Sequence, residues 1–154
     1  MDKEYLVEIE LPIWQDPQGN LIIEKCRDHC YVYFDCWADK WKNDEVTWAD
    51  YIAKLTFKNS WAVKSFDVEF YDIHTIDDPK YKSSIYIVEN SLWLKDMMEK
   101  RENYYGNWTK WKDNKYYHYH IEGHDNYFDI IAEDYSIEKI MKNENHYYNR
   151  LWNE

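Results

Sequence analysis

The sequence predicts an α+β fold, with a mostly antiparallel sheet of about six or seven strands and two or three helices. Several segments alternate apolar and polar residues, which is the pattern of half-buried strands, and short turn signals separate them. One helical segment lies among the strands and another comes last. Because 154 residues are the length of one ordinary domain, we expect residues 1–154 to form a single domain.

The first three expected strands form a meander. Residues 5–13 alternate in polarity, and residues 16–20 contain Pro17 and Gly19, which favour a turn. Residues 21–26 can therefore return beside the first strand. Residues 30–37 are expected to be the third strand.

The middle of the chain is more ambiguous. In residues 44–57 the apolar residues Trp48, Ile52 and Leu55 share one helical face, which favours a short helix, although a strand can begin at Leu55. Residues 66–71 alternate as a strand does. After a turn signal at residues 77–79, residues 84–88 are expected to form a short buried strand.

The strongest helix signal follows. Asn90 or Ser91 suits the N-cap position, apolar residues recur at helical spacing, and Gly106 suits the end of the helix. Next, residues 115–122 and 126–133 flank a turn and predict a hairpin. A final helix is expected from near Ser136, with Ile137, Ile140 and Met141 facing the core.

Charge and cysteine content exclude several classes of protein. Nineteen Lys and Arg stand against thirty Asp and Glu, a formal net charge of −11, so we expect no general affinity for nucleic acid or for membranes. The N-terminus lacks a signal-peptide pattern, which predicts a cytoplasmic protein. The cysteines, Cys26, Cys30 and Cys36, are expected to be small core residues, because Cys30 and Cys36 would lie about 20 Å apart on a strand, too far to share a metal ion.

The densest mixture of acids and tryptophans follows the third strand, and we expect it to run over the surface as a loop. Tryptophan is enriched at binding hot spots, and carboxylates steer a basic partner. The alternative is a packed loop whose tryptophans fold back under it. The residues predicted to bind a basic partner are Asp35, Trp37, Asp39, Trp41, Asp44, Glu45 and Trp48.

Two other constellations support alternative functions. His118 and His120 would share one face of a strand, with His124 in the adjacent turn, so a metal site or acid–base hydrolysis aided by Asp125 or Asp129 is one alternative. Half-buried histidines without a function are the simpler interpretation. Residues 100–120 mix five bases and two acids with many aromatic residues, which permits nucleotide or single-stranded nucleic-acid binding through Trp108, Lys110 and Trp111.

No phosphate-binding loop, dinucleotide fingerprint or nucleophile elbow occurs, so we expect a binding protein rather than an enzyme, with no cofactor and no metal. In size and acidity the chain resembles intracellular immunity proteins that neutralise bacterial toxins, and phage-encoded inhibitors of bacterial defence enzymes. That resemblance covers composition and includes no motif. It implies an inhibitor that masks the basic surface of a nuclease-type toxin or a defence enzyme.

Overall fold

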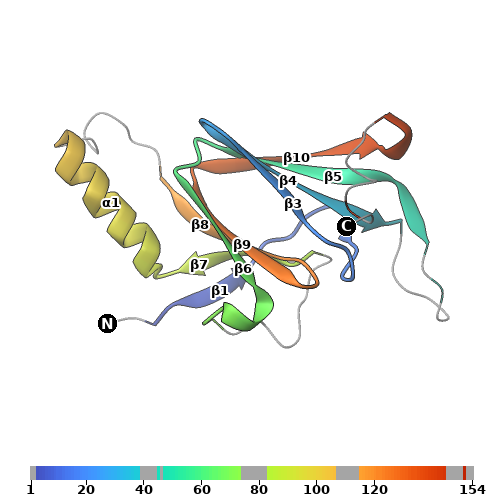
Figure 1. Cartoon of the computed structure of the whole chain (residues 1–154), viewed down its shortest axis with the longest axis horizontal. Coiled ribbons are helices and arrows are strands. Elements are labelled where there is room, and N and C mark those ends of the chain that lie inside the picture. Colours follow the sequence, from blue (N-terminus) through green and yellow to red (C-terminus); the bar gives the residue numbers. More distant parts are fainter. Residues whose placement is uncertain are drawn as a thin grey trace.

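The computed structural model describes residues 3–38, 45, 47–73, 83–106, 115–144 and 151. These residues form ten β-strands, one α-helix and two short 3₁₀ helices (Figure 1). Two antiparallel sheets contain all the strands. The first, sheet A, has the order β1 (Tyr5–Glu8), β7 (Ile85–Glu89), β8 (Tyr117–Glu122), β9 (Asn126–Ala132) and β6 (Ala62–Asp67).

The second sheet, sheet B, is built around the two longest strands. Its order is β10 (Asp134–Met141), β5 (Trp48–Lys58), β4 (His29–Trp37) and β2 (Trp14–Gln15), and β3 (Ile22–Cys26) also pairs with β4. The 3₁₀ helix η1 (Val68–Phe70) follows β6, and η2 (Lys142–Glu144) follows β10.

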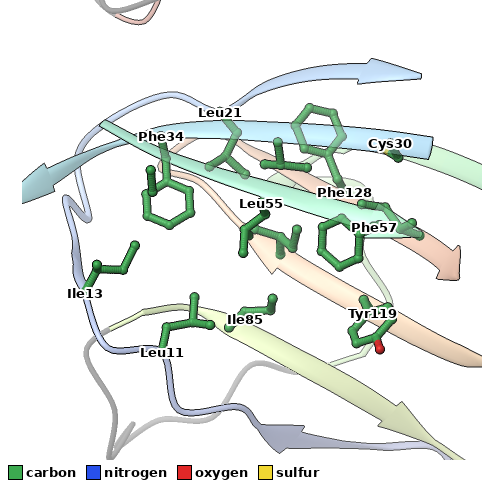
Figure 2. Close-up of a cluster of buried hydrophobic side chains, with 14 of the residues drawn as sticks. Leu11, Ile13, Leu21, Cys30, Phe34, Leu55, Phe57, Ile85, Tyr119 and Phe128 are labelled. Atoms are coloured by element: carbon green, nitrogen blue, oxygen red, sulfur yellow. The ribbon is translucent and has the colours of Figure 1, made fainter. Parts of the chain in front are cut away.

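The main core lies between the two sheets. Sheet B contributes Leu55 and Phe57 (Figure 2), both fully buried. Sheet A contributes Ile121 and Ile130, which are fully buried as well. Cys30 and Cys36 are also buried here, and burial raises the pKa of each thiol to about 12. The prediction of core cysteines is confirmed for these two and wrong for Cys26, which is exposed.

The helix α1 (Leu92–Tyr105) lies at one end of the molecule (Figure 1). It begins where predicted, because the Ser91 hydroxyl accepts a hydrogen bond from the Leu94 N–H at 3.0 Å, and Gly106 ends it. No residue of α1 is buried. Trp93, Leu94 and Met97 pack against Tyr116 and Ile131.

The predicted fold class is wrong in three respects. Over the described residues there are ten strands rather than about six or seven, they form two sheets rather than one, and there is one α-helix rather than two or three. Residues 44–57 were expected to hold a helix but contain most of β5, and the expected final helix is β10. These two strands pair from Lys58 opposite Asp134 to Tyr51 opposite Met141. Pairing with a neighbouring strand therefore overrides the local periodicity.

Burial on both faces explains why β10 resembles a helix in its sequence. Ile137 packs against the core between the sheets, whereas Ile140 packs on the opposite face of sheet B, against a second cluster that contains Ile22, Ile52 and Leu151. Apolar residues three positions apart lie on one face of a helix but on opposite faces of a strand. A strand that is covered on both faces can therefore show the same spacing of apolar residues as a helix.

The predicted N-terminal meander is also wrong, apart from its second half. Strand β1 pairs with β7 in sheet A, with Tyr5 opposite Glu89, while β3 and β4 form the expected hairpin. The expected strand at 66–71 ends at Asp67, where η1 begins. The strand at 84–88 and the hairpin of β8 and β9 are confirmed. Of the helices that the structure describes, none has the length and apolar character needed to cross a membrane.

Candidate functional site

Polar side chains are buried on the outer face of sheet A. Side chains alternate along β8, so that Tyr119 and Ile121 enter the core while His118 and His120 lie on the opposite face. Asp129 on β9 is the cross-strand neighbour of His120. The exposed fractions of His118, His120 and Asp129 are only 5%, 0% and 3%. Such buried polar groups need partners, and the Nδ1 atoms of His118 and His120 have them in Ser91 and Asp129.

One carboxylate oxygen is the centre of this cluster. The Oδ1 atom of Asp129 accepts hydrogen bonds from His120 Nδ1 at 2.9 Å and from the Tyr71 hydroxyl at 3.3 Å. His118 Nε2 lies 3.0 Å from the same oxygen, although its ring is not oriented for a hydrogen bond there. Burial raises the pKa of Asp129, but the two histidines outweigh it and lower the pKa below its ordinary value.

His120 lies between two carboxylates. Its Nε2 atom is 3.4 Å from Glu122 Oε1, while its Nδ1 donates to Asp129. The Tyr71 ring stacks on the imidazole at 4.0 Å between centroids. Burial lowers the pKa of His120, but the two carboxylates outweigh it, so the pKa is raised and the charged form is favoured.

His118 connects the cluster to α1. Its Nδ1 atom lies 2.6 Å from the Ser91 hydroxyl oxygen, and that oxygen already accepts the hydrogen bond from Leu94 N–H. The Ser91 hydroxyl hydrogen can point at Nδ1 in the tautomer that carries the imidazole hydrogen on Nε2, the nitrogen that faces Asp129. Close polar contacts link Ser91, His118, Asp129, His120 and Glu122 in that order, and we call this series the buried polar chain.

Two cavities reach the buried polar residues from the molecular surface. A groove of about 920 Å³ between α1 and strands β7 and β8 is lined by Ser91 and His118, among others. A second cavity of about 370 Å³ is lined by His118, Asp129, Tyr71 and Lys64, among others. His118 borders both, so this imidazole is within reach of a bound molecule despite its burial.

The structure brings together two of the three histidines singled out in the sequence. His124 lies in the exposed turn after β8, where its Nδ1 is 3.0 Å from Asp125 Oδ1. Within the described ranges, no three His, Cys, Asp or Glu side chains are placed to hold a metal ion. Sequence reasoning missed Ser91, Tyr71 and Glu122 as members of the cluster. The N-cap signal did identify Ser91, but nothing local to that signal indicates a contact with His118.

The predicted acidic and tryptophan-rich surface is only partly exposed. Asp35 and Trp37 are not in a surface loop: they belong to β4 and are 1% and 8% exposed, and Asp35 pairs with Lys142 at 3.0 Å. Both are buried because β4 is covered on its two faces. Glu45 and Trp48 are exposed. The remaining predicted residues, Asp39, Trp41 and Asp44, lie outside the described residues.

A different group of exposed acidic residues lies in and beside η1. Phe70 is 64% exposed and Val68 is exposed beside it. The Val68 N–H donates to the Asp125 carbonyl at 3.2 Å, which joins η1 to the turn between β8 and β9. We call this region the η1 surface; its exposed carboxylates are Asp67, Glu69, Asp72 and Asp125. Sequence reasoning missed it because residues 66–71 were expected to be a strand.

The basic aromatic stretch is described only in part. The Arg101 guanidinium lies over the rings of Trp61, at 5.3 Å, and Tyr105, at 5.0 Å, beside a cavity of about 410 Å³. Trp108, Lys110 and Trp111 lie outside the described residues. Of this stretch, the structure thus shows the Arg101 cation in contact with aromatic rings of the protein itself.

No protein-family model, curated protein or solved structure matches this chain.

Proposed function

We propose that this protein is a small acidic binding domain of the inhibitor or immunity type, which acts in the cytoplasm by masking a basic surface of a macromolecular partner. The net charge of −11 supports this at the scale of the chain. The observation that carries the proposal is the η1 surface, where an exposed aromatic ring and four exposed carboxylates belong to η1, the residues that flank it and the turn bonded to it.

The η1 surface has the composition of a binding hot spot. Phe70 supplies an apolar anchor that is 64% exposed, and Val68 extends it. Residues 67–72 and 123–126 contain four acids and neither Lys nor Arg. An apolar centre with a charged rim is how protein interfaces are commonly built, and a single sign of charge selects the opposite sign in the partner. On a nuclease, these carboxylates would occupy the places of nucleic-acid phosphates.

The η1 surface is also held in place before binding. Tyr71, next to Phe70, stacks on His120 and donates to Asp129. The backbone bond from Val68 to Asp125 fixes the other side. A surface ordered in advance loses less conformational entropy on binding.

The test measures binding to a panel of catalytically inactive nuclease toxin domains with basic clefts. We expect at least one domain to bind, with an affinity that falls at least about tenfold between about 50 and 300 mM NaCl. Phe70→Ser and Glu69→Lys should each weaken that binding at least about tenfold, because they remove the anchor and reverse a rim charge.

Two matched controls accompany these variants. Tyr104→Ser removes an aromatic ring that is 81% exposed on α1, and Glu10→Lys reverses an exposed charge outside the η1 surface. Both should bind as the wild type does. Absence of binding to every domain at low salt, or binding that Phe70→Ser and Glu69→Lys leave unchanged, would reject the proposal.

A further inference from the structure

Ser91, His118 and Asp129 stand in the order in which hydrolytic enzymes use a hydroxyl nucleophile, a general base and a carboxylate that orients the base. The Ser91 oxygen is 2.6 Å from His118 Nδ1, and His118 Nε2 is 3.0 Å from Asp129 Oδ1. We propose that these three residues form a hydrolytic site for uncharged carboxylic esters with an apolar acyl group. This activity is separate from binding at the η1 surface.

The direction of the hydrogen bonds suits general-base catalysis. Leu94 N–H donates to the Ser91 oxygen, and in the tautomer with the imidazole hydrogen on Nε2 the Ser91 hydroxyl donates its own hydrogen to His118 Nδ1. When Nδ1 takes that proton, the resulting imidazolium faces the Asp129 carboxylate through Nε2. In the most familiar serine hydrolases Nε2 of the histidine accepts the serine proton and Nδ1 faces the carboxylate, the reverse of the arrangement here. General-base catalysis requires only that one ring nitrogen accepts the proton while the other faces the carboxylate. Such contacts tighten when substrate binds.

Ser91 occupies a strand–turn–helix junction. Strand β7 ends at Glu89, Asn90 adopts a left-handed conformation with φ 58°, and Ser91 caps the helix of 14 residues. The next backbone N–H, that of Leu92, holds a carboxylate oxygen of Glu4 at 3.3 Å. An N–H beside the nucleophile that already binds a negatively charged oxygen can bind the oxyanion of a tetrahedral intermediate once Glu4 moves aside.

The groove determines the substrate class. Ser91 and His118 lie in its lining together with the apolar side chains Ile87, Leu94 and Met98. Its volume of about 920 Å³ is in the range of small-molecule sites. Three acids, Glu89, Glu99 and Glu102, line the same groove against one base, Lys95, so an anionic ester would be repelled. An uncharged ester with an apolar acyl chain fits both conditions.

The reaction uses water as its only co-reactant. The Ser91 oxygen adds to the ester carbonyl carbon and its proton moves to His118 Nδ1. The bond to the alcohol oxygen then breaks, and the proton on Nδ1 passes to that oxygen as the alcohol leaves. Water adds to the acyl–Ser91 ester and gives a proton to Nδ1, which returns it to Ser91 as the carboxylic acid departs. No oxidation or reduction occurs.

His120 acts as a positioning residue in this arrangement. Its hydrogen bond holds Asp129 Oδ1, the same oxygen that His118 Nε2 faces. When His120 is protonated, its charge also offsets part of the charge of Asp129, which lowers the cost of burying that carboxylate. Nothing in the reaction requires His120 to touch the substrate.

The experiment uses a fluorophosphonate probe with an alkyl chain, which reacts with activated serines and releases fluoride. We expect one adduct, located on Ser91 by peptide mass mapping, together with hydrolysis of p-nitrophenyl butyrate. Ser91→Asn should abolish both, because asparagine caps a helix as well as serine does but has no hydroxyl. His118→Gln should slow labelling at least about a hundredfold.

Two further variants keep the result decisive. Ser65→Asn changes an exposed serine on β6 and should label as the wild type does. Met98→Glu leaves the helix cap intact, makes the groove more acidic and should slow labelling of Ser91 at least about tenfold. An adduct on another residue, no adduct on the folded protein, or butyrate hydrolysis that survives in Ser91→Asn would overturn the proposal.

Discussion

At the scale of single residues, Asp129 is the junction of the buried polar chain. Its Oδ1 atom contacts His118 and His120 from β8 and the Tyr71 hydroxyl from the segment after η1. The two histidines could be predicted as neighbours, because alternate strand residues share a face. Their buried partners could not, since Tyr71 reaches them only through the tertiary fold. Tyr71 also has a raised pKa, first from burial and then from Asp129, so it remains a hydrogen-bond donor.

The charges of this chain predict a dependence of stability on pH. His120 has a raised pKa, so its contribution is fully present below the ordinary histidine value of about 6.5 and is lost as the pH rises through the higher folded value. Asp129 has a lowered pKa, so its contribution is present above the ordinary value of 3.8 and is lost as the pH falls through the lower folded value. We therefore expect the free energy of unfolding in urea to decrease from about pH 6 to about pH 8.5.

Measuring the same pH dependence in a variant identifies the group that causes it. His120→Gln should be less stable than the wild type at pH 6 and should lose less stability between about pH 6 and 8.5. His124→Gln changes an exposed histidine and should keep the wild-type slope. Equal slopes in the wild type and in His120→Gln would mean that His120 does not carry the effect.

At the scale of elements, local signals succeeded where the element is specified locally. The cap at Ser91 and the end at Gly106 define α1 within the helix itself. Strands β5 and β10 differ, because each is specified by its partner and by layers on both faces, which are distant in sequence. The burial of Ile140 against Leu151 illustrates this dependence. The local spacing of apolar residues therefore does not distinguish β5 and β10 from helices.

The turn between β8 and β9 gives a prediction at this scale. A Cβ atom on Gly123 would lie 3.0 Å from Leu21 Cγ and 3.1 Å from the Asn126 carbonyl oxygen. Gly123→Ala should therefore lower the free energy of unfolding by about 1–3 kcal/mol, as overpacking does. Chemical denaturation measures this value.

Gly106 offers the matched comparison. It has φ 58° but no atom within 4 Å of an added Cβ, so Gly106→Ala should cost only the backbone strain, about 1 kcal/mol. If Gly123→Ala proved no more costly than Gly106→Ala, steric contact at the turn would not be what requires glycine there.

At the scale of the whole molecule, stability comes mainly from the layer between the sheets. Leu55 on β5 is fully buried in this layer (Figure 2). Leu55→Ala should lower the free energy of unfolding by about 2–5 kcal/mol, because it leaves a cavity between the sheets that the neighbouring side chains fill only in part. Leu92→Ala, on an exposed leucine of α1, should change it by less than about 0.5 kcal/mol. A similar effect for both substitutions, measured by urea denaturation, would contradict this picture of the core.

The sequence pattern indicated a largely antiparallel protein but could not divide its strands between two sheets. That division depends on β1, whose partner β7 lies far along the chain, and on the crossing to sheet B before β2. The same limit applies to the candidate sites. Ser91 and His118 meet only because β8 pairs with β7, the strand that α1 follows. The η1 surface exists only because β6 ends at Asp67.

The pairing of β1 with β7 also has a consequence in time. During synthesis, β1 is made before β7 and lacks this partner strand until residues 86–89 have been added, whereas the β3–β4 hairpin can already close. Contacts so distant in sequence are the slow ones to form. Refolding should thus proceed with sheet A completed late, when β1 pairs with β7.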